Sequence, residues 1–278
     1  MVDKESLIQF RLRQLEFCEN IHPIQFGNHV LSVSLEKKNF TKIYVYSYGD
    51  IVSSHIVSFG GWEDNEVKSI LELLRNSKGL HQVEDPLFLD IGSNVGWFSF
   101  VVASEGFRTV SFEALQNNVQ LMRTTLCENP ILMERLTLVN RALSETEKTC
   151  SILSLSDNYG DGTVSCESND SNKYNQTIMR LRGKVRMHKL DRYIEESVYV
   201  LKIDIEGFEL FALKGGSLLF KMYKVYYIVT EINTNCLTDV GLTCEDYARF
   251  LDFIGFKLSQ TSFEGPFIEL SEIIKYSE

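Results

Sequence analysis

The pattern of apolar and polar positions changes character near residue 86. Downstream, short continuous apolar runs alternate with segments in which apolar residues recur every three or four positions. Continuous runs indicate strands buried on both faces, and the longer spacing indicates amphipathic helices. The runs predict strands at 87–91, 108–113, 135–141, 198–204 and 225–232, with helices at 95–105, 116–128, 208–221 and 243–254. This alternation predicts an α/β fold with a doubly wound, mostly parallel sheet.

The residues upstream of this region follow a different pattern. "TKIYVYSYGDIVSSHIVSF" (41–59) alternates around Gly49-Asp50, which predicts a hairpin. "EDNEVKSILELLRNSKG" (63–79) predicts an amphipathic helix with Gly79 after its end. We therefore expect an N-terminal extension or cap over 1–80 and one ligand-binding domain over 81–278.

Three further segments carry local signals. Residues 156–180 are rich in Ser, Asn, Asp and Gly, which predicts a long loop over the sheet edge or the active site. "RLRGKVRMHK" (180–189) is typical of a solvated edge strand, where alternating cations discourage pairing; contact with an anionic acceptor is the alternative. The segments "FKLSQ" (256–260) and "FIELS" (267–271) flank a turn and predict a closing pair of strands.

The most informative stretch is "LFLDIGSNVGWFSF" (87–100), in which a strand leads through a glycine-containing turn into a helix. This arrangement is a general nucleotide cradle, because the helix start offers free N–H groups and glycine permits close backbone approach. Dinucleotide folds use Gly-x-Gly-x-x-Gly, which Asn94 interrupts, and phosphate loops use Gly-Lys-Ser/Thr, which is missing. The loop therefore disfavours a diphosphate ligand.

The spacing Asp90-x-Gly92-x-x-x-Gly96 suits S-adenosylmethionine, a nucleoside without phosphate. Asp90 and the loop backbone would receive its ammonium group, and Gly92 would let the ribose and methionine portions pass close. Glu113 ends the next predicted strand, where a carboxylate would accept hydrogen bonds from both ribose hydroxyls. The alternative is a tight strand-to-helix turn followed by a solvated acid.

The third element is "VLKIDIEGFELFALKGG" (200–216). Its strand should lie beside strand 87–91, at the point where strand order reverses and ligands bind. The carboxyl end of this strand would bring Asp204 and Glu206 to the cofactor, and acids beside apolar residues suit a general base. Alternatively, Asp204 caps the following helix. We expect Glu209 to face water.

Composition narrows the classes of function. The formal charge of −10 and the pI near 5.1 disfavour a nucleic-acid substrate. The N-terminus lacks the apolar core of a signal peptide, and no apolar run approaches membrane-spanning length. The six cysteines show neither Cys-x-x-Cys spacing nor the density of a disulfide scaffold, which favours a reducing, cytoplasmic setting.

Together these segments make the sequence similar to the FkbM family of S-adenosylmethionine-dependent methyltransferases. The matching segments lie in family order across 87–233: "FLDIGSNVGWFSF", "FEALQNNVQLM", "VNRALSE", "KLDRYI", "VLKIDIEGFELFALKGG" and "IVTEIN". Upstream, "DIVSSHIVSFGGWE" (50–63) is similar to the segment that precedes the family's fold. The resemblance implies a class I methyltransferase sheet, Rossmann-like and closed by an antiparallel last strand. It also implies O-methylation of a hydroxyl on a sugar or another small metabolite.

The resemblance also implies roles for individual residues. The cofactor-binding set would be Asp90, Gly92, Ser93, Asn94, Gly96, Glu113, Asn140 and Ala142, with Ser93 in place of a common alanine and the last two near the adenine. Family members usually follow the ribose acid with two prolines. Here Ala114 and Gln116 replace them and Asn118 is kept, which puts the shape of the adenine wall in doubt.

The acceptor side is less defined. Asp204 and Glu206 are the candidates for base or acceptor-positioning groups. The candidates for contact with the substrate are Trp62, Glu63, His188, Glu231 and Asn233. Oxygens at the strand ends could also hold Mg²⁺, although no diagnostic spacing supports it and we expect no metal. Methyl transfer to RNA or protein, and a non-catalytic cofactor-binding module, remain the alternative functions.

Overall fold

The computed structural model describes residues 6–20, 30–35, 39–166, 179–269 and 272. The helices are α1 (Leu7–Glu19), α2 (Ile51–Phe59), α3 (Asp64–His81), α4 (Trp97–Ser104), α5 (Gln116–Glu128), α6 (Pro130–Arg135), the 3₁₀ helix η2 (Leu190–Arg192), α7 (Glu209–Lys214), α8 (Ser217–Met222), α9 (Thr234–Asp239) and α10 (Cys244–Phe253). The strands are β1 (Val30–Ser34), β2 (Lys42–Tyr46), β3 (Leu87–Ile91), β4 (Arg108–Phe112), β5 (Leu136–Val139), β6 (Ala142–Leu143), β7 (Thr149–Leu155), β8 (Asn158–Ser165), β9 (Met179–His188), β10 (Val198–Ile203) and β11 (Val225–Thr230).

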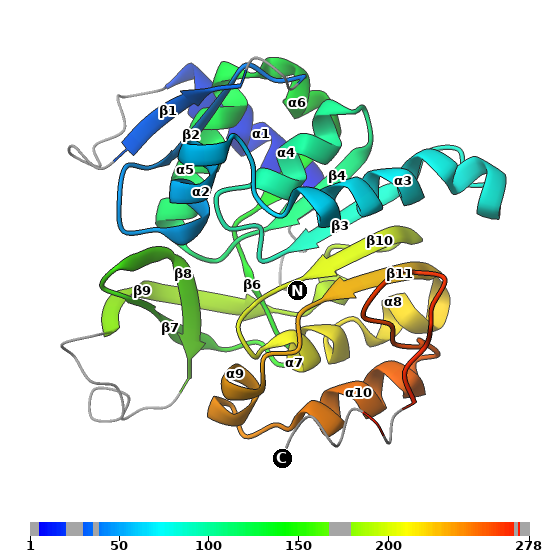
Figure 1. Cartoon of the computed structure of the whole chain (residues 1–278). Helices are drawn as coiled ribbons and strands as arrows, with labels where there is room; N and C mark the ends of the chain where they lie inside the picture. Colours follow the sequence, from blue (N-terminus) through cyan, green and yellow to red (C-terminus); the bar gives the residue numbers. More distant parts are fainter. Residues whose placement is uncertain (1–5, 21–29, 36–38, 167–178, 270–271, 273–278) are drawn as a thin grey trace.

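A five-stranded sheet in the order β11-β10-β3-β4-β5 forms the centre, and every neighbouring pair is parallel. Helices cover both faces (Figure 1). Phe88 packs in the cluster that contains α3, α4 and α5, whereas Leu89 and Ile91 pack with α7, α8 and α10. Burial on both faces explains the continuous apolar run of β3. The predicted α/β sheet and the pairing of β10 with β3 are confirmed.

The antiparallel last strand is not shown by the structure. Residues 256–260 and 267–269 contribute one isolated antiparallel bridge, between Leu258 and Ile268, and residues 270–271 of the predicted pair lie outside the described residues. Helix 208–221 is also divided, because Gly215 and Gly216 separate α7 from α8. Glycine in a helix interior is unfavourable, which accounts for the break.

The predicted hairpin at 41–59 is wrong in its second half. β2 pairs with β1, and residues 51–59 form α2 instead of a strand. Asp50 begins this helix, because its carboxylate accepts the Ser53 N–H at 2.7 Å and so caps the first turn. Ser53 and Ile56 then bury one helical face, a spacing of three that the apparent alternation concealed. Helix α3 agrees with its prediction and extends to His81.

A second sheet, in the order β6-β9-β7-β8, lies beside the carboxyl ends of the central strands. The prediction of a loop over 156–180 is wrong for its described part, because 158–165 form β8 and 179–180 begin β9; residues 167–178 lie outside the described residues. β8 reaches the central fold through Gly160, whose carbonyl oxygen accepts from Asn118 Nδ2 at 2.9 Å. The described part of this segment therefore lies over the sheet edge, one of the two predicted positions, in a different conformation.

Four of the six cysteines are paired as disulfides. Cys18 of α1 is bonded to Cys127 of α5, and Cys150 of β7 is bonded to Cys166 after β8. The chain was expected to lie in a reducing setting, and disulfides persist mainly in oxidising compartments. The pairing therefore counts against the predicted cytoplasmic location. Along the described part of the chain, no helix combines the length and the apolar character that crossing a bilayer requires.

This pairing predicts a simple chemical result. Alkylation in denaturant without reductant should modify only Cys236 and Cys244, and prior reduction should expose all six thiols to the reagent. Reduction should also lower the free energy of unfolding by about 2–4 kcal/mol for each bridge, because each closed loop restricts the unfolded chain. Intact mass and urea unfolding measure the two effects. Six alkylated thiols before reduction would contradict the pairing.

Candidate active site

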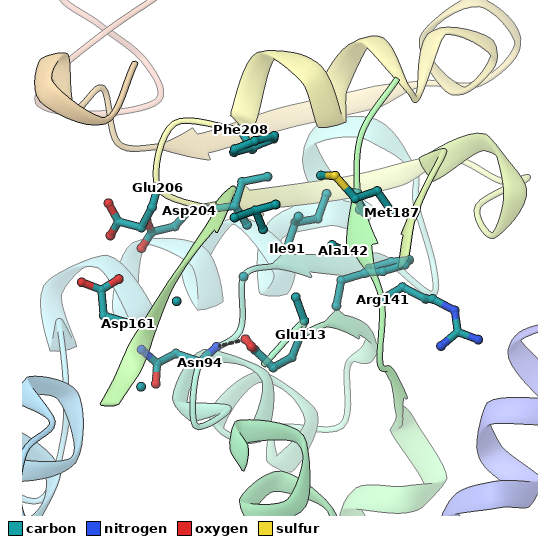
Figure 2. A pocket seen from close by; sticks show the side chains of 18 residues that line it. Ile91, Asn94, Glu113, Arg141, Ala142, Asp161, Met187, Asp204, Glu206 and Phe208 are labelled. Atoms are coloured by element: carbon teal, nitrogen blue, oxygen red, sulfur yellow. Dashed lines mark hydrogen bonds between the residues drawn. The ribbon is translucent and has the colours of Figure 1, made fainter. Parts of the chain in front are cut away.

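The pocket of interest lies at the carboxyl ends of β3, β4 and β10, with β8 as its outer wall (Figure 2). Open α/β sheets place ligand sites at this edge, where strand order reverses. The lining residues are Ile91, Gly92, Asn94, Phe112, Glu113, Ala114, Arg141, Ala142, Leu143, Gly160, Asp161, Gly162, Val164, Met187, Asp204, Ile205, Glu206 and Phe208. Polar groups therefore converge from the β3–α4 loop, the end of β4, the β10–α7 loop and β8.

The β3–α4 loop is compact and pressed against its neighbours. The N–H groups of Gly92 and Ser93 both donate to the Phe112 carbonyl oxygen, at 3.0 and 3.1 Å. Gly92 has φ +84°, and a Cβ atom there would collide with the main-chain oxygen of Asp204. Glycine at this position is therefore required by both conformation and space. Gly96, with φ +90°, begins α4.

Glu113 lies at the end of β4 and ties the loop to the pocket floor. Its carboxylate accepts the Asn94 N–H at 2.8 Å and the Leu115 N–H at 2.7 Å. Burial raises the pKa of Glu113 to about 7, although these hydrogen bonds act in the opposite direction. Asn140 supports the same turn, because its Nδ2 donates to the Glu113 carbonyl oxygen at 3.0 Å. Figure 2 shows this carboxylate directed toward Asn94 at one side of the pocket.

Three carboxylates gather at the opposite side of the pocket, those of Asp161, Asp204 and Glu206 (Figure 2). Burial raises the pKa of Glu206 to about 7, and the charge of Asp161 adds to this effect. The Cys236 thiol donates to Glu206 Oε2 at 2.9 Å. Glu206 also has φ +52°, a left-handed conformation that is costly for a residue with a side chain and that concentrates at functional sites. Glu206 is therefore poised to exchange a proton near neutral pH.

Some of the predicted site residues line the pocket and others do not. Those that do are Gly92, Asn94, Glu113, Ala142, Asp204 and Glu206. The predicted residues outside the lining are Asp90, Ser93, Gly96, Asn140, Trp62, Glu63, His188, Glu231 and Asn233. Asp90 is buried beneath the loop, where its Oδ2 accepts from Ser99 Oγ at 2.5 Å. Its side chain therefore faces the interior below the loop and does not line the pocket.

The structure gives local roles to three acceptor-side candidates. His188 is buried, and its Nδ1 pairs with the Tyr193 hydroxyl at 2.8 Å. Asn233 caps α9 by accepting the Cys236 N–H at 3.3 Å. Trp62 packs edge-on against the His55 ring. Each of these contacts stabilises the fold locally.

Glu209 was expected to face water, and this expectation is wrong. Its side chain is buried, and Oε1 accepts from the N–H groups of Ile205 and Gly207 at 2.9 and 3.2 Å. A carboxylate can satisfy two free donors of a tight turn, which explains why an acid is buried here. Glu209 therefore holds the turn that carries Glu206.

Asp161 is the main pocket residue that sequence reasoning did not identify. It lies on β8, a strand that reaches the pocket only through the pairing of β7 with β8 and β9. The only signal was the position of 156–180 between two predicted strands.

Phe208 and Met187 close the apolar side of the pocket. Across the described ranges, no group of three or more His, Cys, Asp or Glu residues is arranged to hold a metal ion.

The basic segment 180–189 forms β9 and lines a second cavity beside the first. Arg182 Nε donates to Ser154 Oγ at 2.6 Å, and its guanidinium lies over the Tyr159 ring. Arg186 faces Glu147 at 3.6 Å. These contacts link β9 to β8 and to the end of β7 and the residues before it. The prediction of an edge strand is wrong, because β9 pairs with β7 on one side and, at Met187 and His188, with β6 on the other.

Comparison with known proteins identifies one family. The family model described as "Methyltransferase FkbM domain" matches residues 90–258. No curated protein matches the chain significantly. Among solved structures, methyltransferase FkbM from Methylobacillus flagellatus KT is 18% identical, with a TM-score of 0.35, over 52% of this chain and 32% of that one. The chain thus spans about a third of the length of that protein.

Two further solved structures are similar to parts of the chain. A precorrin-6y C5,15-methyltransferase from Geobacter metallireducens GS-15 is 14% identical over 73% of this chain and 80% of that one, with a TM-score of 0.35. An O-methyltransferase from Bacillus cereus, in complex with SAH, is 13% identical over 59% and 67%, with a TM-score of 0.25.

Proposed function

Because the chain belongs to the methyltransferase FkbM domain family, we propose that it transfers a methyl group from S-adenosylmethionine to a hydroxyl oxygen of a small molecule. The family implies S-adenosylmethionine as the methyl donor. Transfer to a hydroxyl oxygen is supported by the position of Glu206. Its carboxyl group has a pKa near 7 and lines the same pocket as the Gly92 loop. A hydroxyl group must lose its proton during methylation, and a base with this pKa suits that task.

The pocket residues fit the donor. Gly92 lines the pocket, and because it has no Cβ the loop packs directly against the main chain of Asp204, which brings the loop and the proposed catalytic acids to one pocket. Glu113 offers carboxylate oxygens to the ribose hydroxyls, and Ala142 and Arg141 would lie on the adenine side. When bound, S-adenosylmethionine supplies a methyl group on a sulfonium, which an acceptor oxygen attacks in line. The protein aligns the acceptor and accepts its proton, for which Glu206 and Asp204 are the proposed groups.

The charge of the pocket is the basis for the proposed class of methyl acceptor. Asp161, Asp204 and Glu206 make this side of the pocket acidic, which disfavours a polyanion and favours an uncharged or weakly charged molecule. A sugar hydroxyl is the first candidate. The decisive experiment incubates the protein with methyl-labelled S-adenosylmethionine and separate pools of metabolites, RNA and protein. Label in the metabolite pool is expected. Label only in RNA or protein would replace the acceptor class, and binding without transfer to any pool would favour a non-catalytic module.

The affinity for S-adenosylhomocysteine should depend on pH through Glu113. The pKa near 7 means that the carboxylate is mostly protonated at pH 6 and mostly charged at pH 8. Ribose hydroxyls donate better to the charged form, so affinity should rise with pH, by at most about tenfold over this range. Glu113→Gln should weaken binding by about 1–3 kcal/mol and remove most of the pH dependence. Calorimetry at both pH values tests this, and equal pH dependence in the variant would assign the effect elsewhere.

A further inference from the structure

Lys202 is a buried lysine next to Asp204, which lines the pocket, and the proposed reaction does not yet use it. It lies on β10 opposite Asp90 of β3 in the parallel register, and its side chain is only 7% exposed. Its Nζ lies 3.5 Å from Asp204 Oδ2 and 4.8 Å from the centroid of the Phe98 ring. Burying an ammonium group costs free energy unless nearby carboxylates compensate its charge.

Carboxylates from three elements provide this compensation. Burial alone would lower the pKa of Lys202, but its charged neighbours raise it above the usual value. These neighbours are Asp204, Asp90, Glu66 and Glu63, from the end of β10, from β3 and from the start of α3. The ammonium group is therefore retained as a charge, since each neighbour favours the protonated form.

Beneath the cofactor loop, Lys202 compensates Asp90. Asp90 Oδ1 is buried and accepts no hydrogen bond from the described residues, while Oδ2 accepts from Ser99. Burial raises the pKa of Asp90, and the charge of Lys202 opposes this rise. The ammonium group thus connects the carboxylate below the loop with Asp204, which lines the pocket itself.

Outside the pocket lining, Lys202 opposes the repulsion among neighbouring acids. Burial raises the pKa of Glu63 to about 7, Glu66 adds to the rise, and Lys202 lowers it. Burial and the charges of Asp204 and Glu63 raise the pKa of Glu231, and Lys202 again acts against them. Lys202 is therefore a shared counter-charge for acids of α3, β10 and the segment after β11.

We propose that Lys202 is a positioning residue for methyl transfer: its buried ammonium group holds the carboxylate of Asp204 in the pocket and offsets the repulsion from Glu63, which lies outside the pocket lining. This rests on the proposed function. Without the ammonium group, the acids facing it would repel one another, and some would take up protons at neutral pH. These acids are Asp90, Asp204, Glu63, Glu66 and Glu231. The acceptor pocket would then lose both its charge and its geometry.

The test compares Lys202→Met, which removes the charge, with Lys202→Arg, which keeps it. Lys224→Met is the matched control. Lys224 also lies over an aromatic ring, that of Tyr226, but it precedes the first residue of β11, at the end of the sheet away from the pocket. ¹³C-glutamate labelling follows the titration of Glu63, whose resonance is assigned with Glu63→Gln. This readout requires neither an acceptor nor turnover. Calorimetry with S-adenosylhomocysteine reports cofactor binding separately.

In Lys202→Met, the pKa of Glu63 should rise by about one pH unit, while the affinity for S-adenosylhomocysteine stays within about threefold. Lys202→Arg and Lys224→Met should leave the Glu63 titration unchanged. With an identified acceptor, the acidic limb of the kcat profile should move to higher pH in Lys202→Met, with KM for the donor unchanged. If Lys202→Met does not fold, Lys202→Gln replaces it in the same titration.

Two results would overturn the proposal. One is a Glu63 titration that does not change in the charge-removing variant. The other is a loss of S-adenosylhomocysteine affinity of tenfold or more, confined to the Lys202 variants, which would assign the ammonium group to the methionine carboxylate of the cofactor. If the unaltered protein binds no S-adenosylhomocysteine, the proposed function fails, and the Glu63 titration still decides the role of Lys202.

Discussion

Replacing Glu206 by glutamine should lower the rate of methyl transfer by about 10²–10⁴-fold, the usual contribution of a positioned acid or base. Glutamine keeps the size and one acceptor oxygen of the side chain but cannot take the acceptor's proton. The affinity for S-adenosylhomocysteine should change little, because the cofactor loop and Glu113 belong to other elements. Single-turnover kinetics with labelled donor measure the first effect, and calorimetry measures the second.

The pH dependence separates this role from a structural one. Since the pKa of Glu206 is near 7, the unaltered enzyme should lose activity as pH falls through this value, when the carboxylate becomes protonated. The residual activity of Glu206→Gln should lack this limb. Asp204→Asn gives the comparison in the same β10–α7 loop. Glu245→Gln, on α10 beside Arg249, is the control for loss of one negative charge. Full activity of Glu206→Gln would be evidence against the assignment of the base.

Replacing Gly92 by alanine should abolish S-adenosylhomocysteine binding and lower the free energy of unfolding by about 2–5 kcal/mol. A left-handed φ of +84° costs a residue with a Cβ about 1–2 kcal/mol. The methyl group would also meet the main-chain oxygen of Asp204 and the Ile205 side chain. Overpacking of this kind costs about 1–3 kcal/mol and shifts backbone. The backbone that would shift is the turn carrying the proposed catalytic acids.

Gly106 provides the matched control for this substitution. It has nearly the same backbone angle, φ +89°, but a Cβ there would meet no atom within 4 Å. Gly106→Ala should therefore cost only the conformational term of about 1–2 kcal/mol and leave cofactor affinity intact. Urea unfolding and calorimetry on both variants isolate the steric term. Similar losses in the two proteins would show that close packing against Asp204 is not what fixes glycine at position 92.

The sequence predicted the central sheet well because burial there has a direct signature. β3 is buried on both faces, so its apolar run is continuous, and its bounds of 87–91 agree with the prediction. The N-terminal region was harder, since α2 buries Ser53 as well as Ile56 and its short pattern resembles alternation. The signal that distinguishes a helix from a strand at 51–59 is Asp50, a residue type that caps helices.

The candidate site was predicted only where one element carries its own signal. Glu113 and Glu206 follow strands directly, so their position at the sheet edge could be inferred. Asp161 could not, because its place depends on the pairing of β8 with β7. The same limit applies to Cys18 and Cys127, which tertiary packing brings together across 109 positions. The burial of Asp90 was missed because Ser99 and Lys202, its neighbours, come from two different elements.

The hydrogen bond from Cys236 to Glu206 has a consequence for chemical durability. Only the thiolate form of cysteine reacts rapidly with oxidants and alkylating agents. Burial, together with the carboxylate of Glu206, raises the pKa of Cys236 well above its usual value. The thiol beside the proposed base is thus kept protonated and inert, even in surroundings oxidising enough to sustain the two disulfides. A cysteine at the catalytic edge can thereby persist without sulfenic acid formation, and an electrophilic inhibitor aimed at it would react slowly.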